Sequence, residues 1–210
     1  AFDLDALLAD LPRATTLMGV PTFYTRLLSS PRLDRELVSH IRLFISGSAP
    51  LLAETHEAFE ARTGKRILER YGMTETGMNT SNPYDGERRA GTVGFPLPGT
   101  EIRITDEDGK VLEAEATGNV EVRGPNVFSG YWNRPELTAT EFRPDGFFIT
   151  GDVGRIDADG YLHIVGRAKD LIIAGGFNIY PKEIELVIDE VEGVTESAVI
   201  GVPHADFGEA

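Results

Sequence analysis

The pattern of hydrophobic residues changes near Gly91, and this change constrains the fold more than any other feature of the sequence. Before Gly91, helical periodicity and short apolar runs follow each other in turn. The predicted helices cover residues 2–11, a segment that begins at Pro21, and residues 53–62, and the predicted strands cover residues 15–20, 42–46 and 66–71. Helices that alternate with strands in this way favour a parallel sheet.

After Gly91 the chain carries short stretches of alternating polar and apolar residues, separated by Asp-Gly pairs. Asp-Gly is a strong hairpin-turn sequence, so this part is predicted to be antiparallel. A short helix is predicted for residues 135–142, and the predicted strands cover residues 93–104, 118–123, 151–156 and 161–165. We expect these strands to form a small sheet or barrel.

A further change of pattern follows Arg167. The elements predicted there are a strand over residues 171–174, a Gly-rich turn, a helix over residues 181–190 and a strand over residues 196–202. The predicted fold class is therefore α/β. Its parts are a parallel α/β subdomain in residues 1–92, a small antiparallel β subdomain in residues 93–168, and a hinge with the start of a small α+β C-terminal domain in residues 169–210.

Composition excludes several classes of function. Acidic residues outnumber basic ones by 34 to 20, and the formal charge of −14 disfavours nonspecific binding to nucleic acid or to an anionic membrane. The chain has no cysteine, which rules out disulfides and thiolate catalysis. Its four histidines lack the spacing of a zinc-binding helix, so no zinc centre is expected.

The sequence opens at Ala1 without an initiating Met, and no signal-like apolar stretch follows. The longest apolar runs fall well short of the ~20 residues that cross a bilayer. We therefore expect a soluble, cytoplasmic protein, and we expect the sequence to begin within a longer polypeptide.

The run Tyr71-Gly72-Met73-Thr74-Glu75-Thr76 follows a predicted strand, where parallel-sheet enzymes place ligand-binding loops. The hydroxyl of Thr74 can donate to a phosphoryl oxygen, the carboxylate of Glu75 can help to hold Mg²⁺, and the Tyr71 ring can stack on a base. These chemistries together fit a nucleotide phosphate. The alternative is a polar loop with no ligand.

This run is a signature of the superfamily that contains acyl-CoA synthetases, nonribosomal peptide adenylation domains and firefly-type luciferases, which the chain resembles. Further segments match the superfamily in the same order. They are Ser46-Gly47-Ser48-Ala49-Pro50-Leu51, residues 91–94 with residues 96–99, Thr150-Gly151-Asp152, residues 166–170, and residues 175–185. The alternatives are a tight strand-to-helix turn for residues 46–51, an ordinary turn at Asp152 and a solvated linker charge at Lys169.

The resemblance implies a role for each matching residue. The implied nucleotide-binding residues are Ser48, Ala49, Pro50, Arg70, Tyr71, Gly72, Met73, Thr74, Asp152 and Arg167. Asp152 and Arg167 correspond to the ribose-binding pair, and Thr74 and Glu75 to catalytic residues, with Glu75 also a ligand of Mg²⁺. Lys169 corresponds to the catalytic hinge, and Gly175, Gly176 and Phe177 correspond to the CoA channel.

The implied reaction is that of an ATP-dependent acid–thiol ligase. A carboxylate attacks the α-phosphate of Mg-ATP to give an acyl-adenylate and pyrophosphate, and the thiol of coenzyme A then attacks the acyl carbonyl. In the superfamily a small C-terminal domain rotates about the hinge between these steps. We expect the phosphate loop to lie before Ala1, and the adenylation lysine to lie after Ala210.

Residues 78–91 resemble malonyl-CoA synthetases more narrowly. A small dicarboxylate needs a cation for its second carboxylate, and either Arg88 or Arg89 can provide it, with Arg88 slightly favoured. Met78 can form a wall of the acyl pocket. The alternative for the two arginines is that they are solvated, and the alternative for Met78 is a place in the core. The alternative functions are a fatty acyl-CoA synthetase, another short-chain synthetase, a peptide-synthetase-type adenylation domain, and a nucleotide-binding relative without catalysis.

Overall fold

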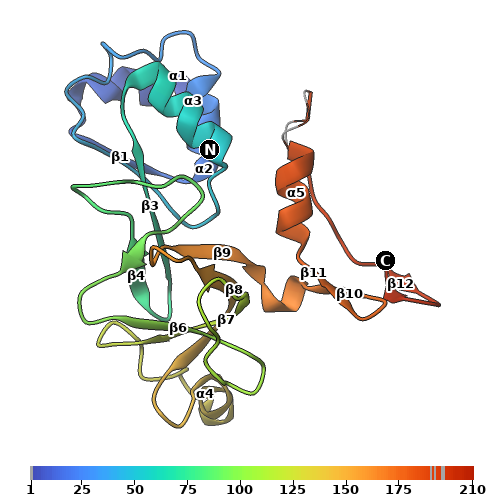
Figure 1. Cartoon of the computed structure of the whole chain (residues 1–210). Coiled ribbons are helices and arrows are strands. Elements are labelled where there is room, and N and C mark those ends of the chain that lie inside the picture. Colours follow the sequence, from blue (N-terminus) through green and yellow to red (C-terminus); the bar gives the residue numbers. More distant parts are fainter. Residues whose placement is uncertain (1, 190, 192, 195–196) are drawn as a thin grey trace. The chain divides into compact units, whose positions relative to one another are not determined.

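The computed structural model describes residues 2–189, 191, 193–194 and 197–210, and it divides the chain into two compact units (Figure 1). The first unit contains Ala1–Thr100 and Gly160–Leu162. The second contains Glu101–Asp159 and His163–Ala210. The predicted three-part division of the chain stays a prediction, and each unit is described by itself.

A five-stranded sheet forms the centre of the first unit, with its strands in the order β1-β2-β3-β4-β5. These strands are β1 (Thr16–Gly19), β2 (Leu43–Ser46), β3 (Ile67–Met73), β4 (Gly77–Ser81) and β5 (Phe95–Pro96). β1, β2 and β3 pair in parallel, as their alternation with helices predicts. β4 and β5 pair antiparallel, and β4 was not predicted from the sequence.

Local signals in the sequence set the bounds of the helices in this unit. The Asp3 side chain accepts a hydrogen bond from the backbone N–H of Ala6 and caps α1. Gly64, at φ 70°, ends α3 in the left-handed conformation that glycine adopts without strain. The helices are α1 (Leu4–Asp10), the short 3₁₀ helix η1 (Leu11–Arg13), α2 (Pro21–Leu28) and α3 (Ala53–Thr63).

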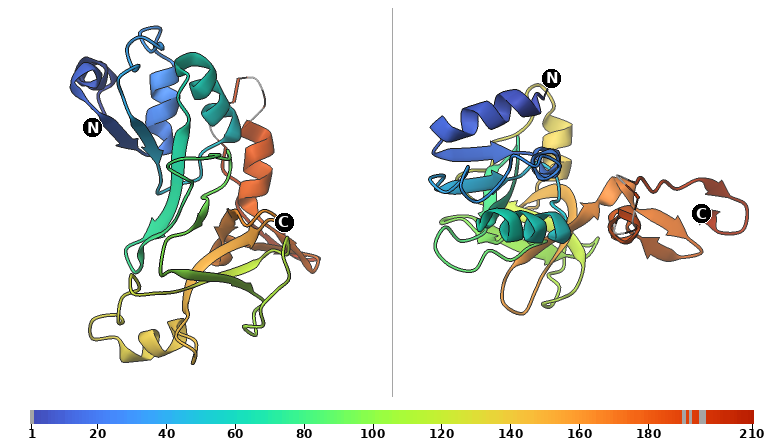
Figure 2. Two further views of the ribbon diagram at one scale, coloured as in Figure 1. Left: turned by 60° about the vertical axis from the view of Figure 1, so that its left-hand side comes forward. Right: turned by 90° about the horizontal axis from the view of Figure 1, so that it is seen from above.

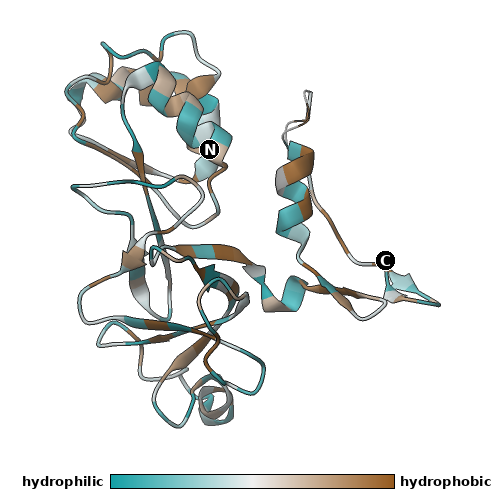
Figure 3. Cartoon of the chain, in the orientation of Figure 1, coloured by the Kyte–Doolittle hydropathy of each residue, from teal (hydrophilic) through white to brown (hydrophobic). Residues whose placement is uncertain are grey.

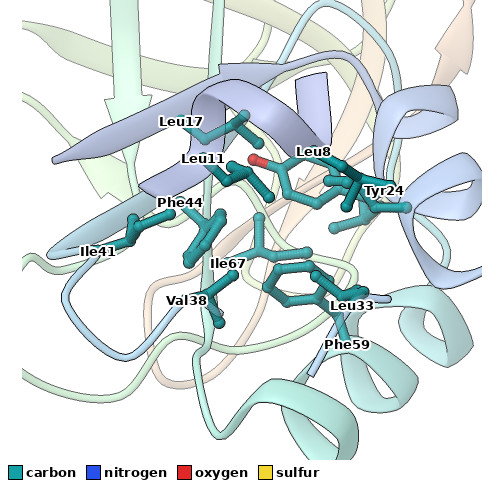
Figure 4. Close-up of a cluster of buried hydrophobic side chains, with 12 residues drawn as sticks. Leu8, Leu11, Leu17, Tyr24, Leu33, Val38, Ile41, Phe44, Phe59 and Ile67 are labelled. Carbon is teal, nitrogen blue, oxygen red and sulfur yellow. The ribbon is translucent and has the colours of Figure 1, made fainter. Parts of the chain in front are cut away.

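Hydrophobic side chains from these helices and from the parallel strands form one buried cluster (Figure 4). The Phe59 ring of α3 meets the Tyr24 ring of α2 edge-on, with the centroids 5.4 Å apart, and it meets Phe44 of β2 at 4.9 Å. The views in Figure 2 show the helices grouped beside the strands. This core fixes the positions at which the parallel strands end.

An antiparallel sheet in the order β6-β7-β8-β9 lies at the centre of the second unit. Its elements are β6 (Glu101–Thr105), β7 (Gly118–Arg123), β8 (Phe148–Ile156) and β9 (Leu162–Arg167), and the helix α4 (Pro135–Glu141) joins β7 to β8. The prediction of one strand over residues 93–104 is wrong. Pro98 cannot donate to a strand ladder and Gly99 turns the chain at φ 84°, so β5 and β6 are separate strands.

The end of the chain forms a second antiparallel sheet, in the order β11-β10-β13-β12. Its elements are β10 (Ile172–Ala174), β11 (Phe177–Ile179), β12 (Pro203–His204) and β13 (Gly208–Glu209), with the helix α5 (Pro181–Asp189) between β11 and β12. Gly175 and Gly176, at φ 59° and 86°, form the two-residue turn between β10 and β11.

Two predictions need adjustment in this region. The predicted strand over residues 196–202 is wrong for residues 197–202, which lie outside any strand, and residue 196 lies outside the described residues. Because the chain reverses at residues 205–207, a short hairpin forms instead, and Val202 exchanges backbone hydrogen bonds with Ala210. The predicted helix over residues 181–190 is observed to Asp189, and residue 190 lies outside the described residues.

The helix α5 carries hydrophobic residues (Figure 3). Among them, Val187 is 67% exposed. In the part of the chain that the structure describes, no helix is both long enough and apolar enough to cross a membrane.

Candidate nucleotide and acid site

The hairpin between β3 and β4 contains residues 71–76, the run that the sequence predicts to bind a nucleotide, which we call the nucleotide motif. Tyr71 lies in β3 as predicted, and Gly72 and Met73 also lie in β3, which corrects their interpretation as part of the loop. Only Thr74, Glu75 and Thr76 form the turn. A Cβ atom on Gly72 would lie 2.0 Å from the Gly77 carbonyl oxygen, so glycine is required for the two strands to approach. Thr74 is exposed and Glu75 is half-buried, so both can face a ligand.

The segment between β2 and α3 lies beside the same hairpin. Ser48 has φ 70°, an unusual conformation for a residue with a side chain, and Ser48, Ala49 and Pro50 are all exposed. A Cβ atom on Gly47 would lie 3.6 Å from Cγ of Arg70, so the Arg70 side chain passes next to this segment. Because β2 and β3 are parallel, their carboxyl ends meet at one edge of the sheet, where α/β proteins bind ligands.

Arg70 holds its guanidinium in unusual surroundings. One terminal nitrogen lies 2.9 Å from the sulfur of Met18, a weak acceptor. The Nε of Arg70 is buried, and no hydrogen-bond partner for it exists among the described residues. A guanidinium normally donates to oxygens, so Arg70 has donor capacity for an anionic ligand.

The guanidinium of Arg88 donates hydrogen bonds to backbone carbonyl oxygens. Its Nε donates to the Pro83 carbonyl oxygen at 3.2 Å, and its two terminal nitrogens donate to Arg66 at 2.7 Å and to Tyr84 at 2.9 Å. Burial lowers the pKa of the Arg88 guanidinium. These contacts fasten the segment between β4 and β5 to the chain that leads into β3.

Arg89 has a different environment from its neighbour. Its guanidinium lies over the Tyr161 ring, 4.2 Å from the centroid, and its Nε lies 3.4 Å from the Glu87 carboxylate. The Tyr161 hydroxyl in turn donates to the Glu87 carbonyl oxygen at 3.1 Å. Met78 is half-buried in β4, where its backbone pairs with Gly72.

In the second unit, the structure brings together two residues that the sequence separates by fourteen positions. Nε of Arg167 lies 3.0 Å from Oδ1 of Asp152, and a terminal nitrogen of Arg167 donates to the Thr150 carbonyl oxygen at 3.3 Å. The Asp152 carboxylate is almost fully buried, whereas the Arg167 side chain is 45% exposed. The Thr150 hydroxyl donates to the Val120 carbonyl oxygen and accepts from the Asp152 N–H.

The other predicted residues of this unit lie close to the end of β9. Lys169 is exposed in the short 3₁₀ helix η2 (Ala168–Asp170). Gly175 and Gly176 form the turn of the β10–β11 hairpin, and the Phe177 side chain beside them is 76% exposed. An exposed hairpin of this kind can approach a ligand through its backbone.

Sequence reasoning missed a buried pair of titratable side chains in the first unit. Nδ1 of His56, on α3, lies 3.4 Å from Oε1 of Glu69, on β3, and both side chains are at least 94% buried. Burial raises the pKa of the Glu69 carboxyl, and the hydrogen bond from His56 opposes that rise. The available signal was a carboxylate in an otherwise apolar strand segment, Ile67-Leu68-Glu69.

The residues present fit a magnesium ion that is brought by a nucleotide. Among the described residues, no three His, Asp or Glu side chains are grouped to hold a metal by themselves. Mg²⁺ commonly takes one or two carboxylates and completes its shell with phosphate oxygens and water. The single carboxylate of Glu75, in the turn of the nucleotide motif, satisfies that requirement.

A sheet whose parallel strands end beside a Thr-Glu turn, and an antiparallel sheet in which the buried Asp152 carboxylate pairs with Arg167, match the adenylate-forming fold. The model of the AMP-binding enzyme family matches residues 1–132, so the chain belongs to this family.

Several relatives narrow the comparison. The chain is 43% identical over 205 residues to a malonate–CoA ligase of Arabidopsis thaliana, covering 93% of this chain and 33% of the relative. It is 42% identical over 211 residues to a long-chain-fatty-acid–CoA ligase of Yersinia pestis, covering 99% and 37%. The structure of ATP-bound MatB from Rhodopseudomonas palustris is 67% identical with a TM-score of 0.96, covering 99% of this chain and 42% of that one. The chain thus spans about a third of the length of its curated relatives.

Proposed function

We propose that the protein is an ATP-dependent acid–thiol ligase that converts malonate, ATP and CoA into malonyl-CoA through malonyl-adenylate. Membership of the AMP-binding family and the similarity to named CoA ligases support the general reaction. The observation that carries the choice of malonate is the Arg70 guanidinium, which lies beside the segment between β2 and α3 with a buried donor that has no partner among the described residues.

We assign nucleotide contacts within each unit by itself. In the β3–β4 turn, the Thr74 hydroxyl would donate to a phosphate oxygen and Glu75 would hold Mg²⁺, which supplies charge neutralisation of the phosphates when bound. In the second unit, Asp152 would accept hydrogen bonds from the ribose hydroxyls, because a carboxylate is a strong acceptor. Arg167 would keep that carboxylate in place through its ion pair.

The second carboxylate of malonate would bind Arg70, which the resemblance alone assigns to the nucleotide. A guanidinium offers two parallel N–H groups to a carboxylate, and a charge-assisted hydrogen bond contributes about 1.5–3 kcal/mol. Arg88 already donates to backbone carbonyl oxygens with its Nε and both terminal nitrogens. We therefore propose that Arg88 maintains the conformation of the segment between β4 and β5. Arg89 and Met78 remain proposed neighbours of the acid, Arg89 through charge and Met78 through the size of its side chain.

Catalysis in this proposal consists of positioning and charge stabilisation. The nucleophiles are the malonate carboxylate and then the CoA thiol, which is consistent with a chain that contains no cysteine. For the second step, Lys169 would serve as the hinge, and the backbone of Gly175 and Gly176 would line the channel for pantetheine beside Phe177.

The test is ATP–pyrophosphate exchange by the full-length protein with malonate, acetate, a long-chain fatty acid and amino acids. We expect exchange with malonate, followed by malonyl-CoA formation when CoA is added. Exchange with the fatty acid but not with malonate would favour the second candidate, a fatty acyl-CoA ligase, which the similarity to the Yersinia pestis enzyme supports. Adenylation without transfer to CoA would point to a carrier-loading adenylation domain.

A further inference from the structure

The buried carboxylate of Glu69 lies where three segments of the first unit meet. On α3 its partner is His56, with Nδ1 at 3.4 Å from Oε1. The backbone N–H groups of Leu51, in the segment between β2 and α3, and of Gly91, in the segment between β4 and β5, interact with the same carboxylate and lower its pKa. One side chain therefore connects a helix and two loops to β3.

Both loops border the proposed acid site. The loop of Leu51 contains Ser48, Ala49 and Pro50, and the Arg70 side chain passes beside Gly47 of the same loop. The loop of Gly91 contains Arg88 and Arg89. Since each loop is bound to the same carboxylate, the separation between them depends on that carboxylate.

The remainder of the second loop is also fastened to this point of β3. The Asn82 N–H donates to the Glu69 carbonyl oxygen at 2.9 Å, and the Asn82 side-chain amide donates to the Thr92 carbonyl oxygen at 2.7 Å. Its side-chain oxygen accepts from the Arg89 N–H at 3.0 Å. Asn82 is 2% exposed, so water cannot readily replace these bonds.

We propose that Glu69 is a positioning residue that sets the width of the acid pocket by holding the Leu51 and Gly91 loops at a fixed separation. This inference rests on the proposed function, because it assigns the pocket between these loops to the acid. Glu69 does not touch the reacting atoms. Its effect should therefore fall mainly on the KM for the acid and on the choice between acids of different size. The effect on the KM for ATP should be small, because only the Leu51 loop carries residues that the resemblance assigns to the nucleotide.

The decisive variants are Glu69→Ala and Glu69→Gln in the full-length protein. Glutamine keeps an acceptor oxygen for the loop amides, whereas alanine removes it. We expect Glu69→Ala to raise the KM for malonate about tenfold, with the KM for ATP changed less than about twofold, and to narrow the preference for malonate over methylmalonate. Glu69→Gln should restore the acid KM to within about threefold of the parent.

A matched control is Glu121→Gln in the second unit. Glu121 is also fully buried, and it lies 2.8 Å from Arg103 and 2.7 Å from Arg143. This variant should lower the midpoint of thermal unfolding without moving the KM for the acid. An equal effect of Glu69→Ala and Glu121→Gln on the acid KM would overturn the proposal, because general destabilisation would then explain both.

Amide hydrogen exchange tests the tether without any activity. In Glu69→Ala, the amides of Leu51 and Gly91 should exchange about tenfold faster, while residues 118–123 of the second unit stay unchanged. Unchanged protection of both amides would refute the proposal even if the protein is a malonyl-CoA ligase. Faster exchange in a protein that activates another acid would refute the choice of malonate and leave the tether supported, with the KM effects then measured on that acid.

Discussion

The guanidinium of Arg167 holds the buried carboxylate of Asp152 at 3.0 Å, across the neighbouring strands β8 and β9. The other contacts of Thr150 and Arg167 keep this carboxylate at a fixed point of the sheet. A carboxylate fixed in this way needs no reorganisation when it accepts hydrogen bonds from a diol such as ribose.

We therefore predict that Asp152→Ala weakens ATP binding about tenfold or more, whichever acid is offered. Titration calorimetry with ATP on the full-length protein measures this effect. The control is Glu101→Ala, which removes an exposed ion pair with Arg123 of 2.7 Å from the same sheet. ATP affinity should be unchanged in the control, and equal affinity in all three proteins would remove the ribose role.

The proposed role of Arg70 in binding the acid gives a second prediction. Arg70→Ala should raise the KM for malonate at least tenfold, roughly the effect of losing a charge-assisted hydrogen bond, and should leave the KM for ATP nearly unchanged. Steady-state kinetics with each substrate varied in turn measures the two constants. A loss of ATP affinity as large as the loss of malonate affinity would instead place Arg70 at the nucleotide.

Arg88→Ala should act mainly on stability. The variant leaves the carbonyl oxygens of Arg66, Pro83 and Tyr84 without their donor, which we expect to cost about 1–3 kcal/mol of unfolding free energy. Urea denaturation of the parent, Arg88→Ala and Arg89→Ala separates the effects. If Arg88→Ala were as stable as the parent but used malonate poorly, Arg88 would be the acid ligand.

Two glycines of the β3–β4 hairpin form a matched pair for a further test. Gly72→Ala should disrupt the hairpin, because the new Cβ atom would overlap the Gly77 carbonyl oxygen at 2.0 Å. In Gly77→Ala the new Cβ atom has no atom within 4 Å, and the only penalty is the φ of 60°. This left-handed conformation should lower the unfolding free energy by about 1–2 kcal/mol. Unfolding midpoints should rank the parent above Gly77→Ala, and Gly77→Ala above Gly72→Ala. The reverse order of the variants would mean that the strands can separate at Gly72.

The sequence was sufficient to predict those helices and strands that local signals determine. Helix periodicity and the glycine at position 64 indicated α3, and Asp-Gly pairs indicated the antiparallel part. The sequence could not predict how far β3 continues past Tyr71. Gly72 and Met73 were therefore interpreted as loop, although they pair with β4. That pairing depends on the contact between Gly72 and the backbone of Gly77, which involves both strands.

Side-chain partners depend on the tertiary structure in the same way. Arg88 and Arg89 are equivalent in the sequence, yet one donates to backbone carbonyls and the other lies over an aromatic ring more than seventy positions away. Asp152 and Arg167 were each found through a resemblance, and only the sheet brings them together. His56 and Glu69 gave no joint signal, because their proximity arises from the packing of α3 on β3.

The pKa of Glu69 leads to a prediction about pH. Burial raises this pKa above its ordinary value of 4.5 in the folded protein, so the folded state binds the Glu69 proton more tightly than the unfolded state does. The resulting stabilisation is fully present below pH 4.5 and is lost as the pH rises through the folded pKa. Relative to Glu69→Gln, which does not titrate, the parent should therefore lose stability as the pH rises from about 4.5 toward neutrality.

Urea denaturation midpoints of the parent and of Glu69→Gln, measured across this pH range, test the sign. Glu101→Gln is the control of opposite sign, because the ion pair with Arg123 lowers the pKa of the Glu101 carboxyl. The stability that Glu101 contributes is present above its ordinary pKa and is lost as the pH falls through the folded pKa, so that difference should shrink toward acid. A parent that gains stability over Glu69→Gln as the pH rises would show that the hydrogen bond with His56 outweighs burial, and that Glu69 holds the two loops as a carboxylate with a lowered pKa.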